Sequence, residues 1–210
     1  MLVNLSIKEF LAQTANNEPV PGGGSVAALN GAIAAALTEM VANLTIGKKK
    51  YEDKEELMQS IVSIANDYQQ QFIRNIEADS IAYKQVFTAF KMPKDTEEQK
   101  TERNREIQEA TKCAIQIPME VARKAFGLMD FIERIIDEGN QNAVTDAGVA
   151  LMNTRTAILS AILNVRINLG MIKDDDDYIN LLTDETNRIE RETLVKEQEL
   201  LQKVNKIITS

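Results

Sequence analysis

One carboxylate interrupts an otherwise continuous apolar stripe. From residue 53 to residue 90, apolar side chains recur every three or four positions, which is typical of the buried side of a helix. The stripe consists of Leu57, Ile61, Ile64, Tyr68, Phe72, Ile76, Tyr83, Val86 and Phe90. Asp79 fills its single gap, three residues after Ile76 and four before Tyr83. Because burial raises the pKa of a carboxyl group, Asp79 is either half of a structural ion pair or a proton-transfer group that works near neutral pH.

The chain of 210 residues contains no histidine and a single cysteine, Cys113. This composition excludes Ser-His-Asp and Cys-His catalysis and zinc sites with nitrogen and sulfur ligands, so no metal site is expected. Acid–base chemistry must then use carboxylates, lysines, tyrosines or the thiol, with shifted pKa values. One cysteine forms no internal disulfide, and the N-terminus lacks the pattern of a secretion leader, so we expect a cytoplasmic protein.

Net charge and hydropathy restrict the partners. The formal net charge is −8, which argues against nucleic acid, because binding to phosphates needs a basic surface. Residues 26–46 are apolar and long enough to span a bilayer, but Asn30, Glu39 and Asn43 lie among them. A charged side chain in mid-span is costly in lipid, so we interpret the segment as a buried helix and expect no membrane association.

Three consecutive glycines, Gly22, Gly23 and Gly24, precede this helix, and Ser25 follows them. Such a stretch offers free backbone N–H groups and positive φ angles next to the positive end of a helix dipole, which favours binding of an anion or a polar ligand. A flexible hinge is the alternative. The absence of a lysine at the required spacing excludes a Walker A loop.

Small residues continue along this helix at a spacing of four, at Ala27, Gly31 and Ala35. They predict tight helix packing, within the chain or across a dimer. The helix ends at Gly47, followed by three lysines that include Lys48 and Lys49. These lysines either complement the helix dipole or bind the anionic tail of a ligand.

A later apolar helix, expected over residues 145–169, carries a line of polar residues. Asp146, Asn153, Thr156, Ser160 and Asn164 fall on one face at helical spacing. In a buried helix such groups need partners. They predict either hydrogen bonds between helices or the lining of a polar ligand site.

The whole chain reads as all-α, because no strand pattern occurs and glycine and proline are rare after residue 31. We expect a single domain over 1–210, with about six helices, some long and antiparallel. The expected helices cover about 6–15, 25–44, 53–90, 95–137, 145–169 and 178–207. Pro118 should kink or interrupt the fourth helix. The four aspartates at 174–177 lack EF-hand spacing and should form a solvated turn that caps a charged last helix.

Several blocks of sequence resemble the cyclodeaminase domain of the formiminotransferase-cyclodeaminase family. The blocks are PVPGGGSVAALNGA with MVANLTIGKKKY, EADSIAYKQVFTAFKMPK, NAVTDAGVA and LNVRINL, in the family order between about residues 6 and 170. Nothing in the chain resembles the formiminotransferase domain, and the segment 174–210 is generic.

The resemblance implies an all-α homodimer that acts on a tetrahydrofolate derivative as substrate, without a tightly bound cofactor. It implies closure of 5-formiminotetrahydrofolate to 5,10-methenyltetrahydrofolate with release of ammonia. The runner-up activity is methenyltetrahydrofolate cyclohydrolase, and a non-catalytic helical interaction module is the alternative from another class. Asp79, costly in a pure scaffold, favours an enzyme.

On this basis Asp79 and Asp146 are the candidate catalytic residues, with Asp79 transferring the proton and Asp146 orienting the substrate. The candidate substrate-binding residues are Gly22, Gly23, Gly24, Ser25, Lys48, Lys49, Asn164 and Arg166. Asp146 and Arg166 lie about 30 Å apart along one helix. If both act, Arg166 makes a distal contact or belongs to the partner's site.

Overall fold

The computed structural model describes residues 1–210 and contains helices and connecting segments only. The all-α prediction is therefore confirmed. The 3-10 helices are η1 (Leu2–Asn4), η2 (Lys49–Lys54) and η3 (Gln141–Ala143). The α-helices are α1 (Ile7–Thr14), α2 (Gly23–Asn43), α3 (Glu55–Phe90), α4 (Glu97–Glu138), α5 (Val144–Leu169) and α6 (Asp176–Thr209).

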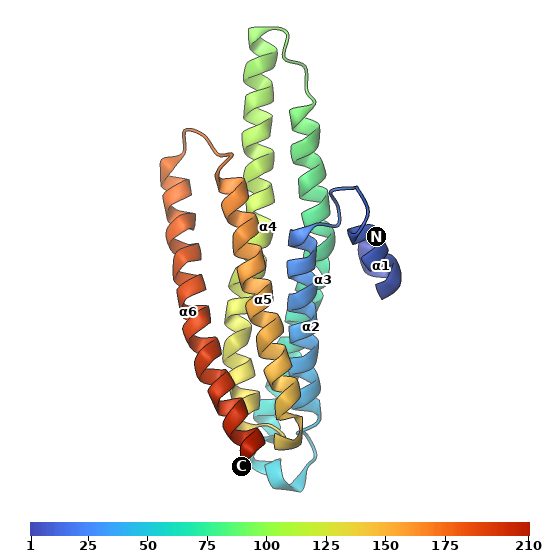
Figure 1. Ribbon diagram of the computed structural model, residues 1–210, viewed down its shortest axis with the longest axis vertical. Coiled ribbons are helices and arrows are strands. Elements are labelled where there is room, and N and C mark those ends of the chain that lie inside the picture. The colour runs from blue at the N-terminus through green and yellow to red at the C-terminus, as the bar shows by residue number, and fades with distance from the viewer.

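Five long helices form an antiparallel bundle, and the short α1 lies at its side (Figure 1). α2 packs against α3 and α5, and α4 packs against α3 and α5. α6 covers α5 and α4 from the opposite side. The α3–α4 hairpin projects beyond the other helices at one end, so the start of α2 and the end of α5 lie partway along it.

Side-chain caps fix several helix starts. Ser6 and Glu9 form the capping box typical of the pattern at residues 6–9. Thr96 and Gln99 form a second one at the start of α4. In the acidic turn, Asp175 accepts a hydrogen bond from the Tyr178 amide, which confirms that this turn caps the last helix.

The small residues of α2 are buried against α3 and its neighbours. Ala27 and Ala35 are fully buried, and a Cβ added at Gly31 would lie 2.8 Å from the ring of Phe72. No real side chain tolerates such an approach without displacement of the ring. The stripe therefore provides tight packing within the chain.

Pro118 lies inside α4, which runs unbroken from Glu97 to Glu138, so of the two expected outcomes, a kink or an interruption, the interruption does not occur. A proline removes one N–H donor, here the one that would reach the carbonyl of Ala114 four residues earlier. The side-chain amide of Asn168 in α5 donates to that carbonyl at 3.5 Å. Pro118 itself is buried.

α2 and the segment 141–169 are the two stretches that pass a length and composition test for membrane spans. Both lie inside the bundle, yet only about half of each is buried. The remainder forms an exposed apolar surface, which we call the α2–α5 face. Its large apolar residues are Ile33 and Met40 of α2, Leu44 directly after α2, and Val149, Met152, Leu163 and Ile167 of α5.

Candidate functional site

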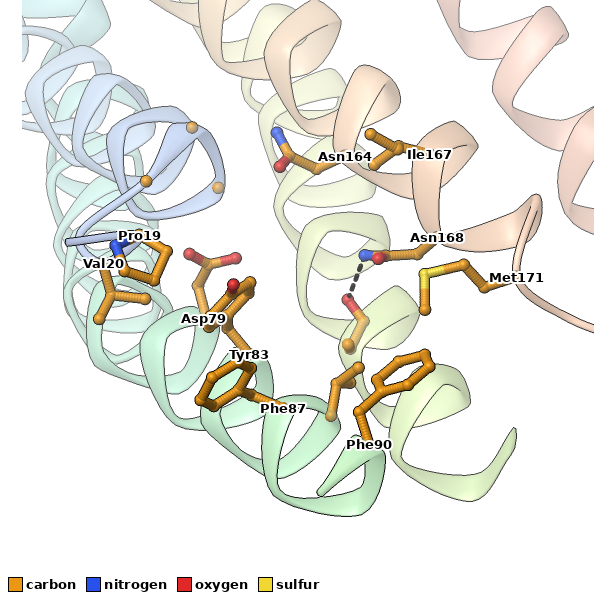
Figure 2. Close-up of a pocket in the computed structure, with 15 residues that line it drawn as sticks. Pro19, Val20, Asp79, Tyr83, Phe87, Phe90, Asn164, Ile167, Asn168 and Met171 are labelled. Atoms are coloured by element: carbon orange, nitrogen blue, oxygen red, sulfur yellow. Dashed lines mark hydrogen bonds between the residues drawn. The ribbon is translucent and has the colours of Figure 1, made fainter. Parts of the chain in front are cut away.

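A pocket of about 420 Å³ opens where α2 begins and α5 ends. One wall comes from α3 and carries Asp79 and Tyr83, and the facing wall comes from α5 and carries Asn164 and Asn168 (Figure 2). The three glycines at the start of α2 and the adjoining Pro19 close one side. The pocket thus gathers residues from four separate parts of the chain, including α4.

Ser25 holds the carboxylate of Asp79. Its hydroxyl lies 2.9 Å from Asp79 Oδ2, 3.0 Å from the carbonyl oxygen of Ile76 and 3.2 Å from the hydroxyl of Ser80. Ser25 is completely buried and does not line the pocket. Its contacts are therefore those of a residue that positions Asp79, and not those of the direct substrate ligand expected from the sequence.

Burial raises the pKa of Asp79 above its ordinary value of 3.8, and the hydrogen bonds from Ser25 act in the opposite direction. No neighbouring charge contributes to the shift. A structural ion pair, the first alternative from the sequence, is therefore not what the structure contains. Asp79 is a half-buried carboxyl group in a pocket, with a pKa displaced towards neutrality.

The glycines allow a close approach of backbone and side chains. A Cβ added at Gly24 would lie 2.0 Å from Asp79 Oδ1, whereas one at Gly23 would lie 3.4 Å from Asn164 Nδ2. The expected positive φ angles are absent here, since Gly47 is the only glycine that has one. Gly24 thus leaves room for the carboxylate against the first turn of α2.

The apolar stripe of α3 changes its role after Asp79. Phe72 and Ile76 are buried in the core, but Tyr83 and Phe90 are 41% and 42% exposed because they line the open pocket. Phe87, at 50% exposure, lines it too and stacks on Tyr83. The sequence stripe was continued through Val86 and passed over Phe87, whose position four residues after Tyr83 and three before Phe90 was the available signal.

The facing wall contains Asn164, as expected, and also Asn168, which sequence reasoning missed. Its position one helical turn after Asn164 was the available signal. Arg166 points elsewhere: it donates to Asn187 at 2.9 Å and pairs with Glu190, both in α6. Arg166 therefore contributes to helix packing and does not reach the pocket of its own chain.

Asp146, Lys48 and Lys49 lie at the other end of the bundle. Asp146 is in the first turn of α5, and the 18 residues to Asn164 correspond to about 27 Å along the helix. Lys48 and Lys49 follow the C-terminus of α2 and are exposed. The structure thus separates these three residues from Asp79 within one chain.

The polar line on α5 has no partners on other helices. Asn153, Thr156 and Asn164 each donate to the carbonyl four residues earlier in α5, at 2.8–2.9 Å. Of the two alternatives for this line, hydrogen bonds between helices are therefore not what the structure contains, and one side of α5 belongs to the α2–α5 face.

Comparison with known proteins gives the family. The sequence profile of the formiminotransferase-cyclodeaminase family matches residues 6–188. The chain belongs to this family. The match extends beyond residue 170, where the blocks recognised in the sequence end, and into α6.

Individual relatives agree with this cyclodeaminase-family assignment. The chain is 38% identical over 174 residues to the methenyltetrahydrofolate cyclohydrolase of Methylorubrum extorquens, across 83% of this chain and 84% of that protein. It is 29% identical to the formimidoyltransferase-cyclodeaminase of Rattus norvegicus, of which it spans 32%. Its fold matches formiminotetrahydrofolate cyclodeaminase from Thermotoga maritima, with a TM-score of 0.81 at 31% identity, over 99% of this chain and 97% of that one.

Gly24→Ala should disable this cyclodeaminase-family site without unfolding the bundle. The added methyl group would overlap the carboxyl group of Asp79 and drive it from the hydrogen bond with Ser25. Gly23→Ala is the matched control, because its methyl group meets only the amide of Asn164 at 3.4 Å. We expect a loss of about tenfold or more in kcat/KM for Gly24→Ala and a much smaller loss for the control. Equal effects in steady-state kinetics would contradict this role for Gly24.

The buried carboxyl group should also make stability depend on pH. The folded state binds the Asp79 proton more tightly than the unfolded state, so stability falls as the pH rises from 3.8 through the raised pKa. Asp79→Asn should therefore raise Tm at pH 7, and the difference should shrink as the pH is lowered towards 3.8. Asp67→Asn, an exposed change on the same helix, is the control. Thermal unfolding at several pH values tests this, and a Tm difference independent of pH would count against it.

Proposed function

We propose that this protein closes 5-formiminotetrahydrofolate to 5,10-methenyltetrahydrofolate and releases ammonia. The observation that carries the proposal is Asp79, a half-buried carboxyl group with a raised pKa in the pocket between α3 and α5 of a cyclodeaminase-family chain. Ring closure needs a group that accepts one proton and delivers another, and such a carboxyl group can do both. The relative from Thermotoga maritima that shares the fold bears the name of this activity.

The proposed reaction proceeds in two steps at the formimino carbon. The formimino group enters the reaction protonated, as –CH=NH2+. N10 of the substrate attacks its carbon, and the N10 proton passes to the Asp79 carboxylate. Asp79 then returns the proton to the exocyclic nitrogen, whose bond to carbon breaks as ammonia leaves. The formimino carbon is already electrophilic, so the chemistry requires no tightly bound cofactor. The aromatic wall of Tyr83, Phe87 and Phe90 would hold the flat pteridine ring.

A second candidate is methenyltetrahydrofolate cyclohydrolase, favoured by the relative from Methylorubrum extorquens at 38% identity. In this reaction water adds to the methenyl carbon while Asp79 takes its proton. The bond from this carbon to N5 then breaks, and N5 takes up the proton held by Asp79. The hydroxyl group on the carbon releases its proton to solvent, and 10-formyltetrahydrofolate results. A non-catalytic module finds no support in a family whose named relatives are enzymes.

Supplying each substrate to the purified protein distinguishes the reactions. Ammonia release from 5-formiminotetrahydrofolate, together with the appearance of methenyl absorbance, is the expected result. Faster loss of methenyl absorbance on addition of 5,10-methenyltetrahydrofolate would instead support the cyclohydrolase. Turnover of neither folate would refute the proposed function.

Asp79→Asn should lower kcat by about 10²–10⁴, the usual contribution of a general acid–base group, while folate binding persists. The amide keeps the shape and cannot transfer the proton. The wild-type rate should show an inflection above pH 3.8, where Asp79 titrates with its raised pKa, and the variant should lose it. Near-normal turnover with the same pH profile would transfer the catalytic role to another residue.

We further propose that the protein is a homodimer formed through the α2–α5 face. A two-fold axis across the middle of this face would run the α2 and α5 helices of two copies antiparallel. The end that carries Asp146, Lys48 and Lys49 in one copy would then approach the pocket of the other. This arrangement supplies an apolar cover for the exposed residues of the face, and it unites candidate residues that one chain separates.

The exposed Cys113 and the folate substrate are consistent with a reducing cytoplasm.

Mixing two inactive variants tests this composite site. If Asp79 acts with Asp146 of the partner subunit, a dimer of one Asp79→Asn chain and one Asp146→Asn chain has one intact site. Co-expression should therefore restore about a quarter of the wild-type activity, because half of the dimers are mixed and each has one of two sites. No recovery would show that both residues act within one chain.

Ile33→Glu should dissociate the dimer, whereas Leu181→Glu on α6 should not. Light scattering measures the molar mass of both variants.

Lys48 and Lys49 would bind the anionic tail of the folate. Replacing both with glutamate should raise KM more for a polyglutamated than for a monoglutamated substrate, and added salt should reduce the difference because exposed charges are screened. Lys8→Glu on α1 is the control for reversal of an exposed lysine charge away from this end of the bundle. An equal change for both substrates would remove the two lysines from the site.

A further inference from the structure

The pocket contains a backbone carbonyl that its own helix leaves without a donor. Pro118 has no N–H group, so the carbonyl of Ala114 lacks the hydrogen bond that every ordinary helix position supplies. Ala114 lines the pocket. The donor that reaches this carbonyl is the side-chain amide of Asn168, at 3.5 Å, the outer limit of a hydrogen bond.

This carbonyl and Asn168 together present acceptors to the pocket. A carbonyl oxygen has two lone pairs, and the long bond from Asn168 leaves most of this capacity unused. Because a carbonyl only accepts, Asn168 must turn its Nδ2 towards Ala114, and its Oδ1 accepts no hydrogen bond from the protein. Figure 2 shows this pair across the pocket from Asp79, near the side chains of Phe90 and Met171.

We propose that Pro118 frees the Ala114 carbonyl to accept a hydrogen bond from the 2-amino group on the pyrimidine edge of the substrate's pteridine ring. Asn168 holds this carbonyl from the side and offers its own Oδ1 to the neighbouring N–H group. The 2-amino-4-oxopyrimidine edge carries two adjacent donors, the 2-amino group and N3–H, which match two adjacent acceptors. The inference rests on the proposed folate substrate and assigns one end of the pocket to one end of that ligand.

The spacing of the site fits this orientation. Asn164 lies beside Gly23, whose neighbour Gly24 is in close contact with Asp79. Asn168 lies one helical turn further along α5, which is about 6 Å. A bicyclic ring laid along this wall places its N5 edge towards Asp79 and its pyrimidine edge towards Asn168. The apolar side chains of Phe87 and Phe90 then lie against the ring.

The position of Pro118 within α4 indicates that this proline serves ligand binding and not folding. Proline inside a helix lowers stability, and α4 continues unbroken through Pro118, so the bundle does not use it to turn or end the helix. Alanine at this position would restore the N–H group and cover the carbonyl. Pro118→Ala should therefore stabilise the protein while it weakens recognition of the ring.

The experiment compares two ligands on three proteins. The ligands are 5-formyltetrahydrofolate, a stable relative of the substrate, and its 2-desamino-2-methyl analogue, which lacks one N–H donor. Wild-type protein should bind the analogue about tenfold more weakly, the loss expected for one hydrogen bond. Pro118→Ala should raise Tm, bind 5-formyltetrahydrofolate about tenfold more weakly than wild type, and discriminate little between the two ligands. Ile117→Ala, a change to the neighbouring residue that does not line the pocket, should keep the wild-type discrimination.

The outcomes separate this inference from the proposed function. If wild-type protein binds neither ligand, the folate proposal fails, and this inference fails with it. If wild-type protein binds folate and Pro118→Ala keeps the same ratio of Kd values, only the role of the Ala114 carbonyl is refuted. Asn168→Leu provides a second test, because it removes the other acceptor without a change to α4. It should weaken binding of both ligands about tenfold, because both carry N3–H, and undiminished binding of both ligands there would equally overturn the assignment.

Discussion

The approach of the Asp79 carboxylate to the first turn of α2 is the constraint on which this site depends. It requires a residue without a side chain at Gly24, since any Cβ there would lie 2.0 Å from the carboxylate oxygen. It also requires Ser25, which is buried behind the carboxylate and donates to it. The same helix then needs small residues such as Gly31 to stay close enough to α3 along its length. The packing of α2 on α3 thus sets the position and the solvation of one carboxyl group.

The candidate residues lie at two opposite ends of the bundle because the helices that carry them are long. In an antiparallel bundle, residues at the start of α2 meet residues at the end of α5, which brings Gly23 and Asn164 together. The same topology sends Asp146 and the lysines after α2 to the opposite end. In the proposed homodimer, a second copy related by a two-fold axis would reverse this order, which would give the apolar α2–α5 face and the divided set of polar residues a common explanation.

Sequence reasoning reached the helices and Asp79 because both follow from periodicity. A stripe with one polar member predicts a carboxylate on the buried side, and the structure places Asp79 there, beside the pocket. Periodicity does not tell core from pocket wall, so Phe87 was missed and Ser25 was assigned to the ligand. Periodicity also assigns residues to the faces of a single helix and gives no information about contacts between helices or between chains. The contacts of Arg166 with α6, and the bond from Asn168 to Ala114, depend on the distance between helices.

Several features of this chain lower its stability, and they gather at one end of α2. Asp79 is a carboxyl group in a place where burial disfavours its charge. Gly23 and Gly24 are poor helix formers that begin a helix. Pro118 removes a hydrogen bond from the middle of α4. Local rules for a stable helical bundle fail at each of these positions, and such failures are expected where a site needs a charge, a close approach or a free acceptor. Their shared location is a physical argument for the pocket that does not depend on the family.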